Sequence, residues 1–190
     1  MSALRQTLLS PAEYLAIERQ AEHKSEYFAG EMFAMAGAVE RHNIIALNVG
    51  SELRFQLKKR PCKVYPSDMR VRIPATVLYA YPDIVVVCGK PAFEDEVKDT
   101  LLNPTLIVEV LSASTEAYDR GKKFEHYSRI PSFGEYVLIT QKQHKVEHFT
   151  KQNDGKWLYA VATSLDDVLK LPSIDCELAL AEVYDKVEIE

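Results

Sequence analysis

The chain has 190 residues, with 23 Lys and Arg against 28 Asp and Glu, and a formal net charge of −5. Hydrophobic residues make up 47% and charged residues 27%, as in an ordinary soluble globular protein, and the length favours one domain over residues 1–190. The cysteines Cys62, Cys88 and Cys176 lie far apart and form no CxxC, which excludes a Cys-rich zinc site and a disulfide framework. The acidic balance counts against a general nucleic-acid coat, but not against an enzyme that meets DNA or RNA through one local patch.

The sequence shows neither a membrane-spanning segment nor a secretory signal, and both observations bear on where the protein is found. No apolar run reaches the roughly 18–20 residues that a membrane helix needs. The start, MSALRQTLLSPAEYL, turns polar and charged too soon for a secretory signal. We therefore expect a cytoplasmic protein with no membrane partner.

The first part of the chain predicts a helix, a hairpin and a second helix. Ser10, Pro11 and Glu13 form the signature of a capped helix start. The run HKSEYFAGEMFAMAG predicts a hairpin that turns at Gly30. A longer amphipathic helix of about four turns is expected from near His42, because apolar residues recur at every fourth position. These residues are Ile45, Val49, Leu53 and Leu57.

Strand patterns follow Pro61. Alternation in CKVYPSDMRVRI predicts a half-buried strand whose polar side carries Arg70 and Arg72. Residues 82–87 and 105–111 are nearly continuous β-branched runs, as expected of central strands covered on both faces.

The last part of the chain predicts a helix over roughly residues 115–129, a strand at 135–139, a hairpin that turns at 153–155, and a closing helix in LALAEVYDKV. The whole order describes a mixed β-sheet with flanking helices, which is typical of the α/β or the α+β class, and of the two we favour α/β.

An acidic residue inside an apolar strand is the most informative feature of the sequence. Glu109 lies in LIVEVL, where an unpaired carboxylate would cost several kcal/mol, so a cation, a metal or a raised pKa must compensate for it. Asp83 opens another apolar strand directly after Pro82. If the two strands are neighbours, both carboxylates can point into one pocket, and two carboxylates with waters and a phosphate oxygen suit Mg²⁺.

The helix after Glu109 adds three polar groups. Asp119, Lys123 and Tyr127 are spaced i, i+4 and i+8 and lie along one helical stripe. A lysine there could stabilise charge on a phosphate or hold the attacking water. Two plainer interpretations stay open: a structural ion pair for Glu109, and a surface helix salt bridge between Asp119 and Lys123.

At these residues the sequence resembles the Uma-two family of PD-(D/E)XK, restriction-endonuclease-like nucleases. The segments that carry the resemblance are YPDIVVV, LIVEVLSASTEAYDRGKKFEHY and IPSFGEYVLI, and EYFAGEMFAMAG…RHN looks like the family's first hairpin and helix. The resemblance implies a restriction-endonuclease-like core with an N-terminal hairpin and a divalent-metal site for phosphodiester cleavage. Asp83 matches the family's Asp, and Glu109 its acidic position.

The resemblance departs at Leu111, where the superfamily pattern has Lys, and Lys123 is the candidate for that role. Glu26 resembles an acid of the family's hairpin and is a candidate further metal ligand, as is Asp68. His42 could contact phosphate or could simply be a helix N-terminal residue. Basic residues that could contact the nucleic-acid backbone are Arg70, Arg72, Arg120 and Lys122.

The favoured hypothesis is a Mg²⁺- or Mn²⁺-dependent endonuclease that acts on DNA more readily than on RNA. Asp83 and Glu109 would bind the metal, and Lys123, held by Asp119 or Tyr127, would act on the phosphate or the nucleophile. A homodimer is expected, because cutting two strands often uses two sites. The alternatives are an inactive nucleic-acid-binding or accessory protein that keeps the fold, and a structural protein in which Glu109 pairs with Lys123.

Overall fold

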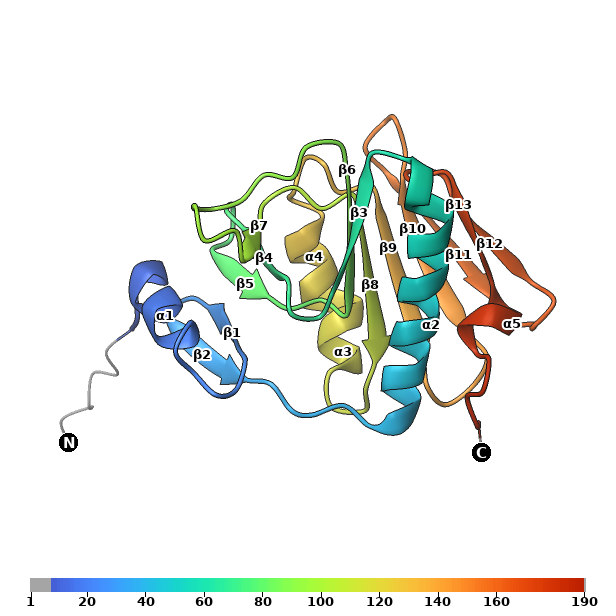
Figure 1. The fold of residues 1–190 in the computed structure, drawn as a ribbon, viewed down its shortest axis with the longest axis horizontal. Coiled ribbons are helices and arrows are strands. Elements are labelled where there is room, and N and C mark those ends of the chain that lie inside the picture. The colour runs from blue at the N-terminus through green and yellow to red at the C-terminus, as the bar shows by residue number, and fades with distance from the viewer. Residues whose placement is uncertain (1–7, 190) are drawn as a thin grey trace.

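The computed structural model describes residues 8–189. The N-terminal segment that was considered as a secretory signal begins with residues 1–7, which lie outside the described part. Two larger β-sheets and a two-stranded sheet organise this part of the chain (Figure 1). The five-stranded sheet has the order β2 (Glu31–Ala34), β1 (Ser25–Phe28), β5 (Leu78–Ala80), β4 (Arg70–Ile73), β7 (Thr100–Leu101). The six-stranded sheet has the order β11 (Trp157–Ala162), β10 (Val146–Lys151), β9 (Glu135–Thr140), β8 (Leu106–Leu111), β6 (Ile84–Cys88), β3 (Cys62–Pro66). The third sheet pairs β12 (Val168–Leu171) with β13 (Cys176–Ala179).

The helices are mostly short. They are α1 (Pro11–Glu18), α2 (Glu40–Gln56) with a 3₁₀ turn η1 (Leu57–Lys59), α3 (Glu116–Tyr118), a π-helical turn η2 (Asp119–Lys123), α4 (Phe124–Tyr127) and α5 (Leu180–Val183). This mixed arrangement of sheets and helices confirms the predicted α/β class. None of the helices among residues 8–189 has the length and apolarity needed to span a membrane.

The predicted N-terminal elements form as the sequence indicated. Helix α1 begins with a reciprocal capping box, in which Ser10 and Glu13 each accept from the other's backbone N–H. The β1–β2 hairpin turns through Ala29 and Gly30, which both have positive φ, at 51° and 92°. Adding a Cβ to Gly30 would also place it 2.6 Å from Leu8 Cβ, so this turn requires glycine for space as well as for conformation.

Strand β8 lies inside the six-stranded sheet, with apolar cores on both faces. Leu106 and Val108 pack with the buried stripe of α2, while Ile107 and Leu111 pack on the opposite face under α4. The nearly continuous apolar sequence of β8 follows from this double burial. Because Glu109 alternates with Val108, its carboxylate belongs to the face covered by the helical segment 116–127.

The strand predicted from CKVYPSDMRVRI is instead two strands in different sheets, β3 and β4. The expected polar side of β4 is also wrong, since Arg70 is only 2% exposed. Its guanidinium lies 2.9 Å from Asp99, and it donates to Thr100 and to the Tyr81 hydroxyl. An alternating pattern cannot distinguish a solvated arginine from one that a distant loop neutralises.

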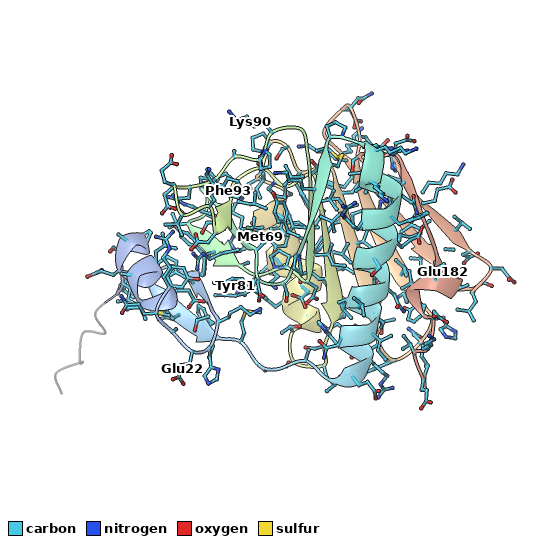
Figure 2. The ribbon with its side chains drawn as sticks, viewed as in Figure 1. Glu22, Met69, Tyr81, Lys90, Phe93 and Glu182 are labelled. Carbon is cyan, nitrogen blue, oxygen red and sulfur yellow. A yellow bond between two sulfur atoms is a disulfide. The ribbon has the colours of Figure 1, made fainter. Side chains whose placement is uncertain are left out.

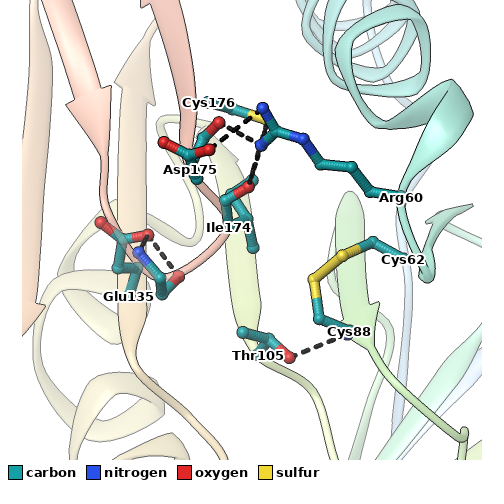
Figure 3. The surroundings of a disulfide bond; sticks show 9 residues. Arg60, Cys62, Cys88, Thr105, Glu135, Ile174, Asp175 and Cys176 are labelled. Carbon is teal, nitrogen blue, oxygen red and sulfur yellow. Dashed lines mark hydrogen bonds and ion pairs between the residues drawn. A yellow bond between two sulfur atoms is a disulfide. The ribbon is translucent and has the colours of Figure 1, made fainter.

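A disulfide joins Cys62 to Cys88, which corrects the conclusion drawn from the cysteine spacing (Figure 3). The two residues are direct partners in the antiparallel β3–β6 pair, although 26 positions separate them in the chain. The strand register, which the sequence pattern did not reveal, brings them together. Cys176 remains a free, buried thiol.

Two helical predictions are also modified. The helix expected over residues 115–129 contains the π-helical turn η2 at its centre. The closing helix shortens to the four residues of α5, because the start of LALAEVYDKV continues strand β13, whose hairpin with β12 the sequence analysis missed.

Candidate functional site

The two strand carboxylates meet at one end of the β6–β8 pair. Ile84 is the register partner of Val108, so Asp83, one position earlier, lies opposite Glu109. The backbone N–H of Val110 donates to Asp83 Oδ2 at 2.7 Å, which fixes this carboxylate at the strand end. The prediction that neighbouring strands bring Asp83 and Glu109 to the same face is thereby met.

Lys123 projects from the π-helical turn into a group of acids. Its Nζ lies 3.2 Å from Glu109 Oε1, 3.2 Å from Asp119 Oδ1 and 3.2 Å from Glu26 Oε1. Lys123 is 6% exposed and Glu109 4%. Burial alone would lower the pKa of Lys123, but the surrounding carboxylates outweigh it and hold this pKa well above its ordinary value.

Glu109 is held from a second side by Tyr127, whose hydroxyl donates to Oε1 at 3.0 Å. Burial raises the pKa of Glu109 well above its ordinary value, Lys123 opposes this, and the nearby acids Asp119, Asp83 and Glu26 add to it. Burial and the neighbouring Glu109 also raise the pKa of Tyr127, so its hydroxyl remains a donor.

Two further groups come from other elements. Glu26 is carried by β1 of the hairpin, and its Oε1 accepts the backbone N–H of Tyr81 at 3.3 Å. Tyr81 lies between the hairpin and the larger sheet (Figure 2). His42, near the start of α2, places Nε2 at 3.2 Å from Asp83 Oδ2. The site therefore joins the hairpin, a strand pair, α2 and the π-helical turn.

The donor atoms fit a hard divalent cation. Asp83 uses Oδ2, and Glu109 uses Oε1, for the interactions above, while Asp83 Oδ1 and Glu109 Oε2 have no hydrogen-bond or ion-pair partner within residues 8–189. In that part of the chain, no group of three or more His, Cys, Asp or Glu residues is arranged to hold a metal ion. A pair of carboxylates is nevertheless the donor set that Mg²⁺ uses when it keeps several waters.

These residues line a cleft of about 1740 Å³. Its lining includes Glu26, His42, Asp83, Glu109, Asp119 and Lys123. The predicted residues Asp68 and Lys122 also line it, although Asp68 is paired with Lys24 at 2.9 Å. Tyr127 contacts the site from behind, within the apolar core.

Three of the predicted nucleic-acid contacts are not brought to the cleft. Arg70 is buried in the five-stranded sheet. Arg72 is paired with Glu94, and Arg120 is paired with Glu116 and Glu147. Each positive charge is already neutralised by the protein.

The sequence analysis missed Tyr118, whose ring lies 5.8 Å from Lys123 Nζ and forms part of the cleft wall. Its position directly before Asp119 was the available signal. It also missed the backbone N–H groups of Tyr81 and Val110, which orient Glu26 and Asp83 and which only a known strand register could reveal.

Comparison with known proteins shows the family and supports the fold. The model of the Uma2 family, described as "Putative restriction endonuclease", matches residues 11–181. An uncharacterized protein of Synechocystis sp. PCC 6803 is 40% identical over 151 residues, covering 80% of this chain and 85% of its own. A second from the same organism is 35% identical over 176 residues, covering 93% and 91%.

A solved structure, described as a "putative nuclease belonging to DUF820" from Anabaena variabilis ATCC 29413, has the same fold. It superposes with a TM-score of 0.77 at 18% identity and covers 93% of this chain and 98% of its own.

Proposed function

Because the chain belongs to the Uma2 family of restriction-endonuclease-like proteins, we propose that it is a Mg²⁺- or Mn²⁺-dependent endonuclease that hydrolyses phosphodiester bonds of DNA. The observation that carries this proposal is the 3.2 Å contact between Lys123 Nζ and Glu109 Oε1. Through this contact, Lys123 of the π-helical turn would supply the lysine that the strand lacks at Leu111. The alternative of an inactive relative rested on that missing lysine.

Asp83 and Glu109 would hold the divalent ion through the carboxylate oxygens that have no partner among residues 8–189. When bound, the ion would supply a water of lowered pKa and polarise the phosphodiester. Lys123 would stay protonated, because its pKa is raised, so it would act as a cation and hydrogen-bond donor and not as a base. In that role it would stabilise charge on the phosphate or orient the attacking water.

The remaining polar residues would position these groups. Tyr127 would fix Glu109 through its hydroxyl, and Asp119 would hold Lys123 on the same helical face. His42 would orient Asp83 through Nε2. Glu26 is the candidate for a further ligand, since its second oxygen has no partner within residues 8–189.

The proposal is tested by incubating the protein with Mn²⁺ and labelled DNA or RNA. We expect cleavage of DNA that requires the metal and that falls by at least about 100-fold in Asp83→Asn and in Glu109→Gln. Glu125→Gln is the matched control, because Glu125 is an exposed acid on α4 whose one ion pair within residues 8–189 is with Arg129. No cleavage of either polymer by the wild type, or equal cleavage by the two site variants, would contradict the proposal. Light scattering tests the homodimer that belongs to the same hypothesis.

A further inference from the structure

Building on the proposed function, we infer that the cleft binds an unpaired nucleic-acid strand, with Phe33 as a stacking surface for a base and Arg54 and Lys122 as phosphate contacts. Of the four basic residues that the sequence indicated as nucleic-acid contacts, Lys122 lines the cleft and Arg70, Arg72 and Arg120 do not.

The size of the cleft favours a polymer segment. Its volume of about 1740 Å³ exceeds the roughly 300–1,000 Å³ of pockets that enclose a single small ligand. One wall is a side of α2, where Asn43, Leu47 and Arg54 recur along successive turns. Because a helix rises about 1.5 Å per residue, Arg54 lies roughly 18 Å along α2 from His42, which touches Asp83. A ligand that reaches both must be extended.

Phe33 lies on the β1–β2 hairpin, next to the carboxylate of Glu26. It is the direct register partner of Glu26 in the β1–β2 pair, so both side chains point from the same face of the hairpin. Phe33 is 48% exposed, lines the cleft and belongs to none of the apolar clusters formed by the described residues. An aromatic ring that is exposed next to the proposed reaction centre can stack on any base.

The charges of the cleft suit a single strand better than a duplex. Arg54 and Lys122 have no ion pair or side-chain hydrogen bond within residues 8–189, whereas Lys24 in the same cleft is bound to Asp68. Affinity for duplex DNA depends mainly on many neutralised phosphates. Two available cations, in a chain of net charge −5, provide few of them, while aromatic stacking does not require a high positive charge.

The experiment compares binding of a fluorescent DNA strand of about 12 nucleotides with that of a hairpin duplex of the same composition, measured by anisotropy. Ca²⁺ replaces Mn²⁺, and gels verify that the DNA stays intact. The variants are Phe33→Ala, Arg54→Gln and Lys122→Gln. Their controls are Phe55→Ala, at an α2 residue that is 75% exposed and outside the cleft, and Lys170→Gln on β12.

We expect the wild type to bind the single strand more tightly than the duplex, and Phe33→Ala to lose about tenfold in affinity. Arg54→Gln and Lys122→Gln should each lose several-fold and lower the salt slope by about 0.7, while both controls match the wild type. Tighter or equal binding of the duplex, no DNA binding, or equal effects of Phe33→Ala and Phe55→Ala would overturn the inference. Strand binding without Mn²⁺-dependent cleavage would overturn the proposed function alone.

Discussion

The ammonium nitrogen of Lys123 lies 3.2 Å from Oε1 of Glu109, although the two residues are 14 positions apart and belong to a helix and a strand. This contact neutralises a carboxylate that would otherwise be buried among apolar side chains and three other acids. Stability and the proposed chemistry therefore depend on the same ion pair.

Replacing Lys123 by Met should destabilise the protein by about 3 kcal/mol, because removing one partner leaves a buried charge uncompensated. The double variant Lys123→Met/Glu109→Gln should regain part of this loss. Denaturant unfolding of the wild type, both single variants and the double variant measures the coupling between the two residues. Strictly additive losses would show that the contact contributes nothing.

A second experiment tests whether a lysine at position 111 can replace Lys123. Leu111 is two residues after Glu109 and points to the same sheet face. Leu111→Lys in the Lys123→Met background should restore a measurable part of the lost cleavage. The double variant staying as inactive as Lys123→Met, while remaining folded by circular dichroism, would argue against equivalent lysine positions.

Tyr127→Phe removes the hydroxyl that donates to Glu109 at 3.0 Å, in a fully buried position. We expect a loss of about 1 kcal/mol in the free energy of unfolding and a several-fold loss of cleavage rate, because Glu109 loses one of the two donors that it has within residues 8–189. Thermal unfolding and initial rates measure the two effects. Tyr159→Phe on β11 is the control, since its hydroxyl donates to Glu147 outside the cleft. An unchanged cleavage rate in Tyr127→Phe would remove Tyr127 from the site.

Low pH should weaken the attachment of α1 to the five-stranded sheet, because Asp99 would become protonated. Hydrogen bonding to Arg19 holds the pKa of Asp99 well below its ordinary value, despite partial burial, with further support from Thr100 and Arg70. A folded-state pKa below the unfolded value of about 3.9 adds stability above that pH, and this stability is lost as the pH falls through the folded-state pKa.

Asp99→Asn should therefore cost about 2 kcal/mol at neutral pH, less than for a fully buried pair, and should flatten the loss of stability below about pH 4. Urea unfolding at several pH values checks this. Parallel pH profiles of wild type and variant would be inconsistent with the assignment.

The Cys62–Cys88 disulfide should stabilise the edge of the larger sheet. Closing a loop over a sequence separation of 26 restricts the unfolded chain, with an expected gain of about 3 kcal/mol. A reducing agent should lower the unfolding temperature of the wild type but not of a Cys62→Ala/Cys88→Ala variant. Thiol titration of the denatured, unreduced protein should find one free thiol, Cys176; finding all three cysteines free would refute the bridge.

Local patterns predicted the elements around the site well. The capping residues of α1, the glycine turn of the hairpin, and the apolar runs of β6 and β8 each determine their own conformation over a few residues. The acid in LIVEVL was informative because its burial requires a partner, and the helical spacing pointed to Lys123 and Tyr127 as candidates.

Long-range register was the part that local patterns could not provide. Arg70 has the sequence context of a solvated strand residue, but Asp99 and Thr100 approach it from β7 and the loop before it and bury it. Cys62 and Cys88 pair for the same reason. Phe33 and Arg54 look like ordinary surface residues until the fold places both in one cleft with the carboxylates.

The most direct test of the central claim is a calorimetric titration of Mn²⁺ into the wild type, Asp83→Asn, Glu109→Gln and the control Glu125→Gln. We predict that wild type and control bind Mn²⁺ alike, and that the two site variants bind it at least about tenfold more weakly while remaining folded. Equal Mn²⁺ affinity in all four proteins would contradict the assignment of Asp83 and Glu109 as the metal-binding pair.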